Sequence, residues 1–360
     1  MNKSATLVLS LAGLLTAIGL LMLIFGQYAF SGPLMVLGFL GLSIGMQLHP
    51  RLKGFSFTML IFTAVCAAMY YPAVFRTVGS FDLKQLIVPI LMVIMFGMGT
   101  SMSVKDFAGV IRMPKGVLIG LLCQFTIMPF VGYGLAMLSG FPPEIAAGII
   151  LVGCSPSGLA SNVMSYLAKA NLALSLTLTM VATLLAPIMT PFLMQLLANE
   201  LVPIDFWAML WSISKIVIIP VIAGLLFNHF FHGKFPLVDK AMPVISMGGI
   251  ALVITIITAA GRDSLLTIGL ALIGVVIVHN VIGYFLGYWG AKLGGMDEKS
   301  CRTIALEVGM QNGGLASGIA LEMGRVATMG LAPAVFGPFM NISGSSLATY
   351  WRDKPEKNEE

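Results

Sequence analysis

Apolar segments of similar length follow one another along almost the whole chain, separated by short polar stretches. Each is about 20 residues long, which at about 1.5 Å per residue matches a hydrocarbon core of roughly 30 Å. They leave no stretch for a soluble domain. We predict twelve membrane-spanning helices, at 5–27, 30–48, 54–75, 85–103, 116–139, 143–168, 172–198, 206–228, 238–261, 264–291, 299–323 and 328–351.

The composition agrees with this pattern and excludes a water-soluble globule. Of 360 residues, 58% are hydrophobic and only 10% are charged, and the mean hydropathy is +0.96. Such values are typical of a polytopic protein of the lipid bilayer. The predicted fold class is therefore an all-α polytopic membrane protein.

The basic residues are divided unevenly between alternate loops. Cytoplasmic loops of membrane proteins are enriched in Lys and Arg. With both termini inside, the inner loops and tails hold Lys3, Arg51, Lys53, Lys105, Arg112, Lys115, Lys169, Lys234, Lys240, Lys292, Lys299, Arg302, Arg352, Lys354 and Lys357. The outer loops hold Arg76, Lys84, Arg262 and Arg325. We therefore predict a multi-pass protein of the cell's inner (plasma) membrane with both termini cytoplasmic. The net charge of +5 reflects this orientation and does not indicate a nucleic-acid partner.

The sequence lacks the motifs of several membrane enzymes and pumps. None of the four histidines lies in an HExxH motif, and there is no phosphate-binding GxxxxGK[ST] loop. The four cysteines show no CxxC or Cys/His spacing that would indicate a metal or redox site. We therefore predict no enzymatic activity and no catalytic residue.

One acidic residue lies deep within a predicted helix. Glu307 is followed four residues later by Gln311, whereas Glu322 lies at the far end of the same segment and is expected to pair with Arg325. An acid at mid-membrane costs roughly 2.5–3.5 kcal/mol, so Glu307 should be neutralised by a proton, a basic side chain or a cation. One interpretation is a protonated Glu307 hydrogen-bonded to Gln311. The other is a cation site.

Two predicted helices contain residues that interrupt helical structure. Gly313 and Gly314 each cost about 1 kcal/mol relative to Ala in a helix interior, and a break leaves carbonyl groups free to bind a cation. The segment "GCSPSGLASN" at 153–162 places Pro156 and Gly158 in mid-span. We predict that both helices are broken.

The two interrupted segments also share sequence. GLAS occurs at 158–161 and 314–317, and "VGYGLA" at 131–136 is followed by "LGYWGA" at 286–291 at almost the same separation. This spacing predicts a five-helix unit and its copy. Five crossings bring the chain to the opposite side, so the copies are inverted, as in many secondary transporters with broken helices that cross.

From about residue 54 to 351 the sequence resembles the bile acid:sodium symporter (BASS) family. The matching motifs are "EVGMQN" at 307–312, "ASNVMSYLAKANLALSL" at 160–176 and Gln124 in "LCQFTIMP". The resemblance implies two bound Na⁺ ions. One site would use Ser161, Asn162, Ser175, Thr179 and Glu307; the other would use Gln124, Glu307, Met310 and Gln311 with the carbonyl of Val308. Independently, Ser175 and Thr179 are four residues apart and share a helix face.

The resemblance also implies a division of the chain. Residues 53–199 would form the first repeat, 200–351 the second, inverted repeat, and 352–360 a cytoplasmic tail. Residues 54–103 and 206–261 would form a panel that rocks against a core containing the crossed helices. The first two helices, residues 1–52, fall outside the ten-helix pattern and are expected to be a stabilising or oligomerising extension.

We therefore expect sodium-coupled symport of a small organic anion by alternating access. Glu307 contributes −1 and two Na⁺ ions +2, so a carboxylate would complete the neutralisation, with Asn312 and Asn341 as donors and Leu159 beside an apolar part of the cavity. Family members often have Pro-Gly-Gly-Thr where this chain has Pro-Ser-Gly-Leu at 156–159. Bile acid, pantoate-like and keto-acid anions all remain candidates. The alternatives are a proton-coupled carrier that uses Glu307, and a channel.

Overall fold

The computed structural model describes residues 3–49, 52, 55–103, 108–231, 234 and 236–354. Four of the predicted cytoplasmic basic residues, Arg51, Lys53, Lys105 and Lys357, lie outside the described residues, as does the predicted tail beyond residue 354.

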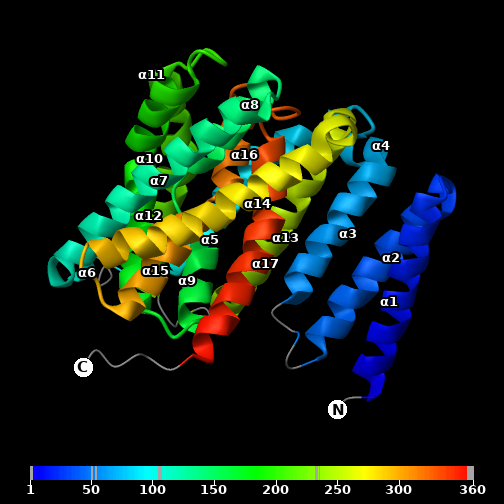
Figure 1. Ribbon diagram of the computed structural model, residues 1–360, viewed down its shortest axis with the longest axis horizontal. Helices are drawn as coiled ribbons and strands as arrows, with labels where there is room; N and C mark the ends of the chain where they lie inside the picture. The colour runs from blue at the N-terminus through cyan, green and yellow to red at the C-terminus, as the bar shows by residue number, and fades with distance from the viewer. Residues whose placement is uncertain are drawn as a thin grey trace.

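Helices account for nearly all of the described chain (Figure 1). They are α1 (Lys3–Ile24), α2 (Tyr28–Gln47), α3 (Ser56–Tyr70), α4 (Pro72–Arg76), the 3₁₀ turn η2 (Leu83–Leu86), α5 (Ile87–Thr100), α6 (Ala108–Arg112), α7 (Pro114–Ser139), α8 (Pro143–Cys154), α9 (Leu159–Leu167), α10 (Leu172–Ala198), α11 (Phe206–Ile213), the π-helical turn η4 (Ser214–Ile218), α12 (Ile219–Phe231), α13 (Pro236–Ala260), α14 (Arg262–Leu293), α15 (Glu298–Gly309), α16 (Gly313–Glu322) and α17 (Leu331–Arg352). Two short strands, β1 (Thr77–Val78) and β2 (Phe81–Asp82), form an antiparallel ribbon.

The all-α membrane class is confirmed by the length and composition of these helices. In the described part of the chain, 7 are long and apolar enough to cross a membrane: Ala5–Ile24, Tyr28–Gln47, Leu83–Thr100, Pro114–Ser139, Leu172–Ala198, Phe206–Phe231 and Arg262–Leu293. Their exposed sides carry large apolar residues such as Leu138 and Leu270, which are 86% and 89% exposed. A lipid environment accounts for such surfaces because exposing large apolar areas to water is unfavourable.

Helices α3, α5, α12 and α13 pack against one another, and α7, α8, α10, α14, α15 and α17 form a second packed group. Within the first group, α5 and α12 approach so closely that a Cβ added at Gly99 would clash with the Val221 carbonyl and one at Gly224 with the Phe96 carbonyl. Glycine is required at both positions because only a bare Cα fits this approach.

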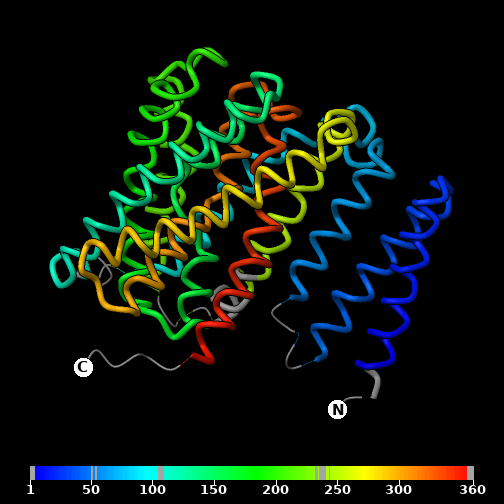
Figure 2. Tube along the Cα trace, in the orientation of Figure 1, coloured from blue at the N-terminus to red at the C-terminus, as the bar shows by residue number. Residues whose placement is uncertain are grey.

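Helices α1 and α2 lie at one edge of the molecule, next to α3 (Figure 2). The Ser31 hydroxyl is hydrogen-bonded to the Tyr70 hydroxyl at 2.8 Å, and Ser43 and Ser56 each donate to the other's backbone carbonyl, at 2.9 and 2.8 Å. These bonds tie α2 to α3, while α1 packs on the far side of α2.

The two segments that were predicted to be broken are each divided into two helices. The segment predicted at 143–168 is interrupted between Cys154 and Leu159, and the one predicted at 299–323 is interrupted between Gly309 and Gly313. Pro156 contributes to the first interruption because it has no N–H to donate to a preceding turn. The second interruption precedes the predicted position: Gly313 and Gly314 are the first residues of α16.

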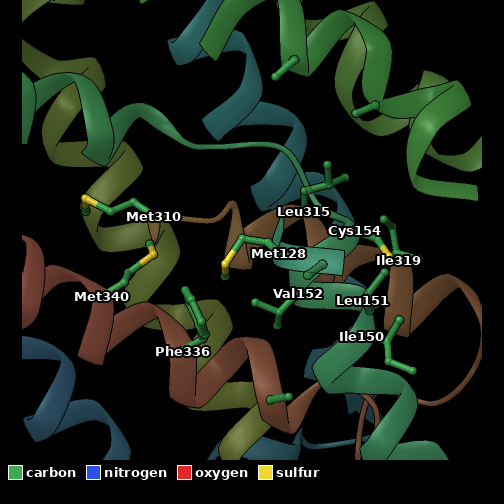
Figure 3. Packing of buried hydrophobic residues seen from close by; sticks show 14 of the residues in the cluster. Met128, Ile150, Leu151, Val152, Cys154, Met310, Leu315, Ile319, Phe336 and Met340 are labelled. Atoms are coloured by element: carbon green, nitrogen blue, oxygen red, sulfur yellow. The ribbon is translucent and has the colours of Figure 1, made fainter. Parts of the chain in front are cut away.

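Buried apolar side chains surround these interruptions. Figure 3 shows Met128, Val152, Leu315 and Phe336 converging from α7, α8, α16 and α17. Each is at most 1% exposed. The interrupted backbone is therefore enclosed by hydrocarbon, where unpaired polar groups are costly.

The predicted pairing of Glu322 with Arg325 is wrong. Arg325 instead forms its ion pair with Glu144 at the start of α8, and Glu144 also accepts a hydrogen bond from the Thr328 hydroxyl. Glu322 accepts a hydrogen bond from the Ser212 hydroxyl of α11 at 3.0 Å. Helix α16 ends before Arg325, so helical spacing no longer positions the two side chains together.

Candidate ion-binding site

The two interruptions lie against each other. The backbone N–H of Asn312 donates to the Pro156 carbonyl at 2.8 Å, and Ser157 pairs with Gln311 in an isolated antiparallel β-bridge. A Cβ added at Gly158 would lie 3.7 Å from the Cα of Asn312. The backbone polar groups freed by one broken helix are thus partly satisfied by the other.

Glu307 lies in the last turn of α15, and only 2% of it is exposed. Its carboxylate accepts hydrogen bonds from the hydroxyls of Ser157 (2.6 Å), Ser175 (2.6 Å) and Thr179 (2.8 Å). No ion pair of the described residues involves Glu307. This leaves the proton and the cation as the candidates for its neutralisation.

The predicted first set of sodium ligands converges on this carboxylate. The Oδ1 atom of Asn162 accepts from Ser175 at 2.8 Å and from Thr179 at 3.0 Å. The Ser161 hydroxyl donates to the Gly158 carbonyl at 2.7 Å and lies 3.4 Å from the Thr179 hydroxyl. Helices α9, α10 and α15 thus bring five predicted residues into one buried oxygen cluster.

The hydroxyl hydrogens of this cluster are too few to satisfy both Glu307 and Asn162 Oδ1. Each hydroxyl has a single hydrogen, yet Ser175 and Thr179 each contact both Glu307 and Asn162. If their hydrogens go to the carboxylate, Asn162 Oδ1 receives none. The Nδ2 of Asn162 is buried without a hydrogen-bond partner. A half-turn of this amide would let Nδ2 donate to the two hydroxyls without a cation, whereas the oxygen-inward orientation would present Oδ1 to a hard cation.

The predicted second set forms a neighbouring amide cluster. Gln124 Nε2 donates to the Ser155 carbonyl at 3.0 Å and to Gln311 Oε1 at 2.9 Å, and Gln311 Nε2 donates to the Val308 carbonyl at 2.6 Å. Gln124 Oε1 is buried and has no partner. The Met310 side chain packs toward Gly344, which leaves its backbone carbonyl as the oxygen that an ion could use.

Glu307 does not join the two clusters by a hydrogen bond. Its described bonds go to hydroxyls, and the Gln311 side chain turns instead toward Gln124. The alternative in which Gln311 hydrogen-bonds Glu307 is therefore wrong. Helix α15 ends at Gly309, so Gln311 no longer lies one turn above Glu307 on the same face.

The three predicted substrate residues lie on the half-helices and on α17. Asn312 caps α16 by accepting the Leu315 N–H at 3.0 Å, and Leu159, which is partly buried, is the first residue of α9. Asn341 donates to the Gly337 carbonyl of its own helix at 2.8 Å. A Cβ added at Gly313 would lie 4.0 Å from the Cα of Gly337, so Gly337 is next to the crossing. Asn341 follows Gly337 by one helical turn and therefore lies one turn away from the crossing.

Two residues that hold the site were missed from the sequence. Ser157 lies in the first interruption, and its hydroxyl bonds Glu307 directly. Asn280 of α14 donates to the carbonyl of Gly309, the last residue of α15, at 2.8 Å, and its own Oδ1 accepts from Ser343 at 2.6 Å. The sequence does contain a feature that points to Asn280. Its separation from Gln124 equals that of the two GLAS tetrapeptides, so Asn280 occupies the position in the second predicted repeat that corresponds to Gln124 in the first.

Known proteins resemble this chain over most of its length. The model of the Sodium Bile acid symporter family matches residues 88–268. The chain is 42% identical over 307 residues to the "Uncharacterized sodium-dependent transporter YocS" of Bacillus subtilis (strain 168), which covers 85% of this chain and 94% of that protein. It is 34% identical over 267 residues to the "Probable sodium/metabolite cotransporter BASS1, chloroplastic" of Arabidopsis thaliana (74% and 67%). It is 33% identical over 264 residues to the "Ileal sodium/bile acid cotransporter" of Oryctolagus cuniculus (68% and 72%).

Together with the all-α membrane fold, these relatives define a sodium-dependent membrane transporter and not an enzyme. The chain belongs to the Sodium Bile acid symporter family. The family resemblance carried by the motifs is thereby confirmed. The matched family model ends at residue 268, so Glu307 and its motif lie beyond it.

Proposed function

We propose that the protein couples the transport of an organic anion to that of Na⁺ by alternating access. The observation that supports the proposal is the environment of Glu307. Its carboxylate is buried where two broken helices meet, accepts hydrogen bonds from three hydroxyl groups and has no ion-pair partner among the described residues. Hard oxygen ligands suit an alkali cation, and broken helices at the centre of a bundle provide ion sites in secondary transporters.

Two sodium ions would be substrates of the transport cycle. Ser161, Asn162, Ser175, Thr179 and Glu307 would hold the first. The unpartnered Gln124 Oε1, Gln311 and the Met310 and Val308 carbonyls would hold the second, and Glu307, the residue before Val308, would act on it electrostatically. Binding there requires Gln311 to release the Val308 carbonyl that it now occupies.

Charge balance favours an anionic organic substrate. Two Na⁺ ions and one carboxylate leave +1 at the crossing, and the N-termini of α9 and α16, capped at Gly158 and Asn312, add partial positive charge. A carboxylate on the substrate would complete the neutralisation and favour sodium binding in return. Asn312 and Asn341 would donate to it, and Leu159 would contact its hydrocarbon body. The bile acid and metabolite named for two relatives are organic molecules.

The architecture that we propose has twelve membrane crossings, with both termini in the cytoplasm and the protein in the plasma membrane. Residues 1–52 form an extension, 53–199 and 200–351 two inverted repeats, and 352–360 a tail. The contacts of Gln124 and Asn280 support the repeats. Gln124 of α7 donates to the Ser155 carbonyl at the first interruption, and Asn280 of α14 donates to the Gly309 carbonyl at the second.

The deciding experiment is uptake by the purified full chain in proteoliposomes. Bile acids, pantoate, 2-keto acids, amines and neutral sugars are offered with an inward gradient of Na⁺, of H⁺, or of neither. Accumulation above equilibrium that requires the Na⁺ gradient supports the proposal. Accumulation driven by H⁺ alone would support the proton-coupled alternative, and equilibration without accumulation would support the channel. Uptake confined to amines or neutral sugars would refute the anion assignment.

A further inference from the structure

A cavity of about 510 Å³ that is open to the surface lies at the ends of α7, α14 and α15, away from the helix crossing. Its lining residues are Lys115, Lys292, Gly295, Met296 and Asp297. The volume is within the range of small-molecule sites. Helix α15 separates the cavity from Glu307, which lies near the opposite end of that helix.

The cavity holds more positive than negative charge. Lys115 Nζ donates one hydrogen bond, to the Gly295 carbonyl at 3.1 Å, so that two of its three N–H groups remain for another acceptor. Gly295 has φ +67°, and a Cβ there would approach Lys115 Nζ. Asp297 is already engaged by the N–H and hydroxyl of Ser300 at 2.9 and 2.7 Å. Lys292 acts electrostatically on Glu298, which is ion-paired with Arg302 at 2.8 Å. The five charged groups therefore leave a net charge of +1.

Each lysine continues into an apolar stripe on its own helix. On α7, Lys115 is followed at helical spacing by Leu118 and Leu122, and both are exposed. On α14, Lys292 is preceded at the same spacing by Trp289 and Phe285, which are also exposed. Helices α7 and α14 pack directly together, with a Cβ at Gly290 lying 2.9 Å from the Cys123 sulfur.

The arrangement has the two parts of a lipid site. A cationic cavity at the ends of membrane helices suits a phosphate group, and exposed leucine and aromatic side chains next to it suit acyl chains at the level of the hydrocarbon boundary. A Trp side chain has its own preference for that boundary. A free phosphate would be served by the lysines but would make no use of the two stripes.

We propose that this cavity binds the headgroup of an anionic glycerophospholipid, with the acyl chains along the stripes of α7 and α14. A phosphodiester of charge −1, as in phosphatidylglycerol, matches the net charge of the cavity. On the orientation proposed above, the lipid belongs to the cytoplasmic leaflet. The binding itself requires neither sodium nor a transported substrate, so it can be tested even if the transport proposal fails.

The test is thermal unfolding of the purified full chain in detergent, titrated with phosphatidylglycerol or with phosphatidylcholine of the same acyl chains. Phosphatidylglycerol should raise the midpoint temperature saturably, and phosphatidylcholine should not. The pair Lys115→Gln and Lys292→Gln should weaken this binding about 30-fold, from roughly fivefold for each lysine near an anionic lipid. Arginine at both positions keeps the charges and should restore binding.

The matched control is Lys169→Gln with Lys354→Gln, which removes the same charge from loops outside the cavity and should change the binding midpoint less than about twofold. An equal loss in the control would show diffuse attraction and overturn the site. An unchanged midpoint in the cavity variant would overturn it as well. Inorganic phosphate and glycerophosphoglycerol without acyl chains are the remaining arms. Stabilisation by either one at the lipid's concentration would assign the cavity to a soluble phosphate.

Discussion

Replacing Glu307 by glutamine tests the ion site with a minimal structural change. Glutamine has nearly the same shape, and its Oε1 and Nε2 can still bond hydroxyl groups such as those of Ser157, Ser175 and Thr179, which now contact the carboxylate at 2.6, 2.6 and 2.8 Å. The substitution removes the negative charge and leaves the cluster hydrogen-bonded. Alanine would also open a cavity and leave three hydroxyls without a partner. A loss of sodium binding could then not be separated from a loss of folding stability.

The expected magnitude follows from the loss of one charge. Two unit charges about 4 Å apart attract with about 4 kcal/mol at the effective dielectric constant of about 20 that describes protein sites. Because about 1.4 kcal/mol is tenfold in affinity, the variant should bind Na⁺ about 10³-fold more weakly. If the wild-type Kd for Na⁺ is in the millimolar range, the Kd of the variant would then exceed the salt concentrations that the assay can use.

The assay is thermal stability in detergent as NaCl replaces choline chloride at constant ionic strength. A ligand that binds only the folded protein stabilises it in proportion to the logarithm of its concentration above Kd. The wild-type curve should rise with sodium, and the Glu307→Gln curve should stay flat. Glu322→Gln is the control, since it removes the same charge from an acid whose described bond goes to Ser212.

Two results would refute the reasoning. A Glu307→Gln variant with the wild-type sodium midpoint would show that the carboxylate is not a ligand. A wild-type protein that sodium does not stabilise, but whose stability depends on pH only when Glu307 is present, would favour the proton-coupled alternative.

Four further changes have defined outcomes. Ser175→Ala should weaken the affinity for sodium, measured from the thermal stabilisation, at least about tenfold. Ser165→Ala removes a buried hydroxyl without a partner and should leave the affinity unchanged. Equal effects of the two substitutions would contradict the assignment. Asn280→Leu should lower the unfolding free energy by about 1–3 kcal/mol, seen as a lower midpoint, by orphaning buried partners. Asp297→Ala should cost about 1 kcal/mol at pH 7. Burial is the largest single influence on the pKa of Asp297 and raises it, but the hydrogen bonds from Ser300 and from the backbone N–H groups of Asp297 and Lys299 together lower the pKa below its usual value. The stabilisation is therefore present above the unfolded pKa and should be lost as the pH falls through the folded pKa. Deleting residues 1–52 should leave sodium stabilisation intact, and a well-expressed truncation that ignores sodium would assign the extension to the mechanism.

The sequence alone predicted the positions of the helices and of both interruptions to within a few residues. These features depend on local properties, namely the length of an apolar run and the missing N–H of Pro156. The carbonyl groups without an intrahelical partner follow from the helix end itself. Ser175 and Thr179 were likewise placed on one face by spacing within a single helix, and their hydroxyls do share Glu307 and Asn162. The family motifs supplied the choice of residues, which spacing could not.

Contacts between distant segments were decided only by the tertiary structure. The bond from Ser157 to Glu307, that from Gln124 to Gln311 and the ion pair of Arg325 with Glu144 each join residues more than a hundred positions apart. Predictions from helical spacing failed where a helix stopped, since Gln311 and Arg325 lie just beyond helix ends. The reason is physical: a helix fixes its neighbours three and four residues away, whereas the packing of whole helices decides which buried polar groups meet across the crossing.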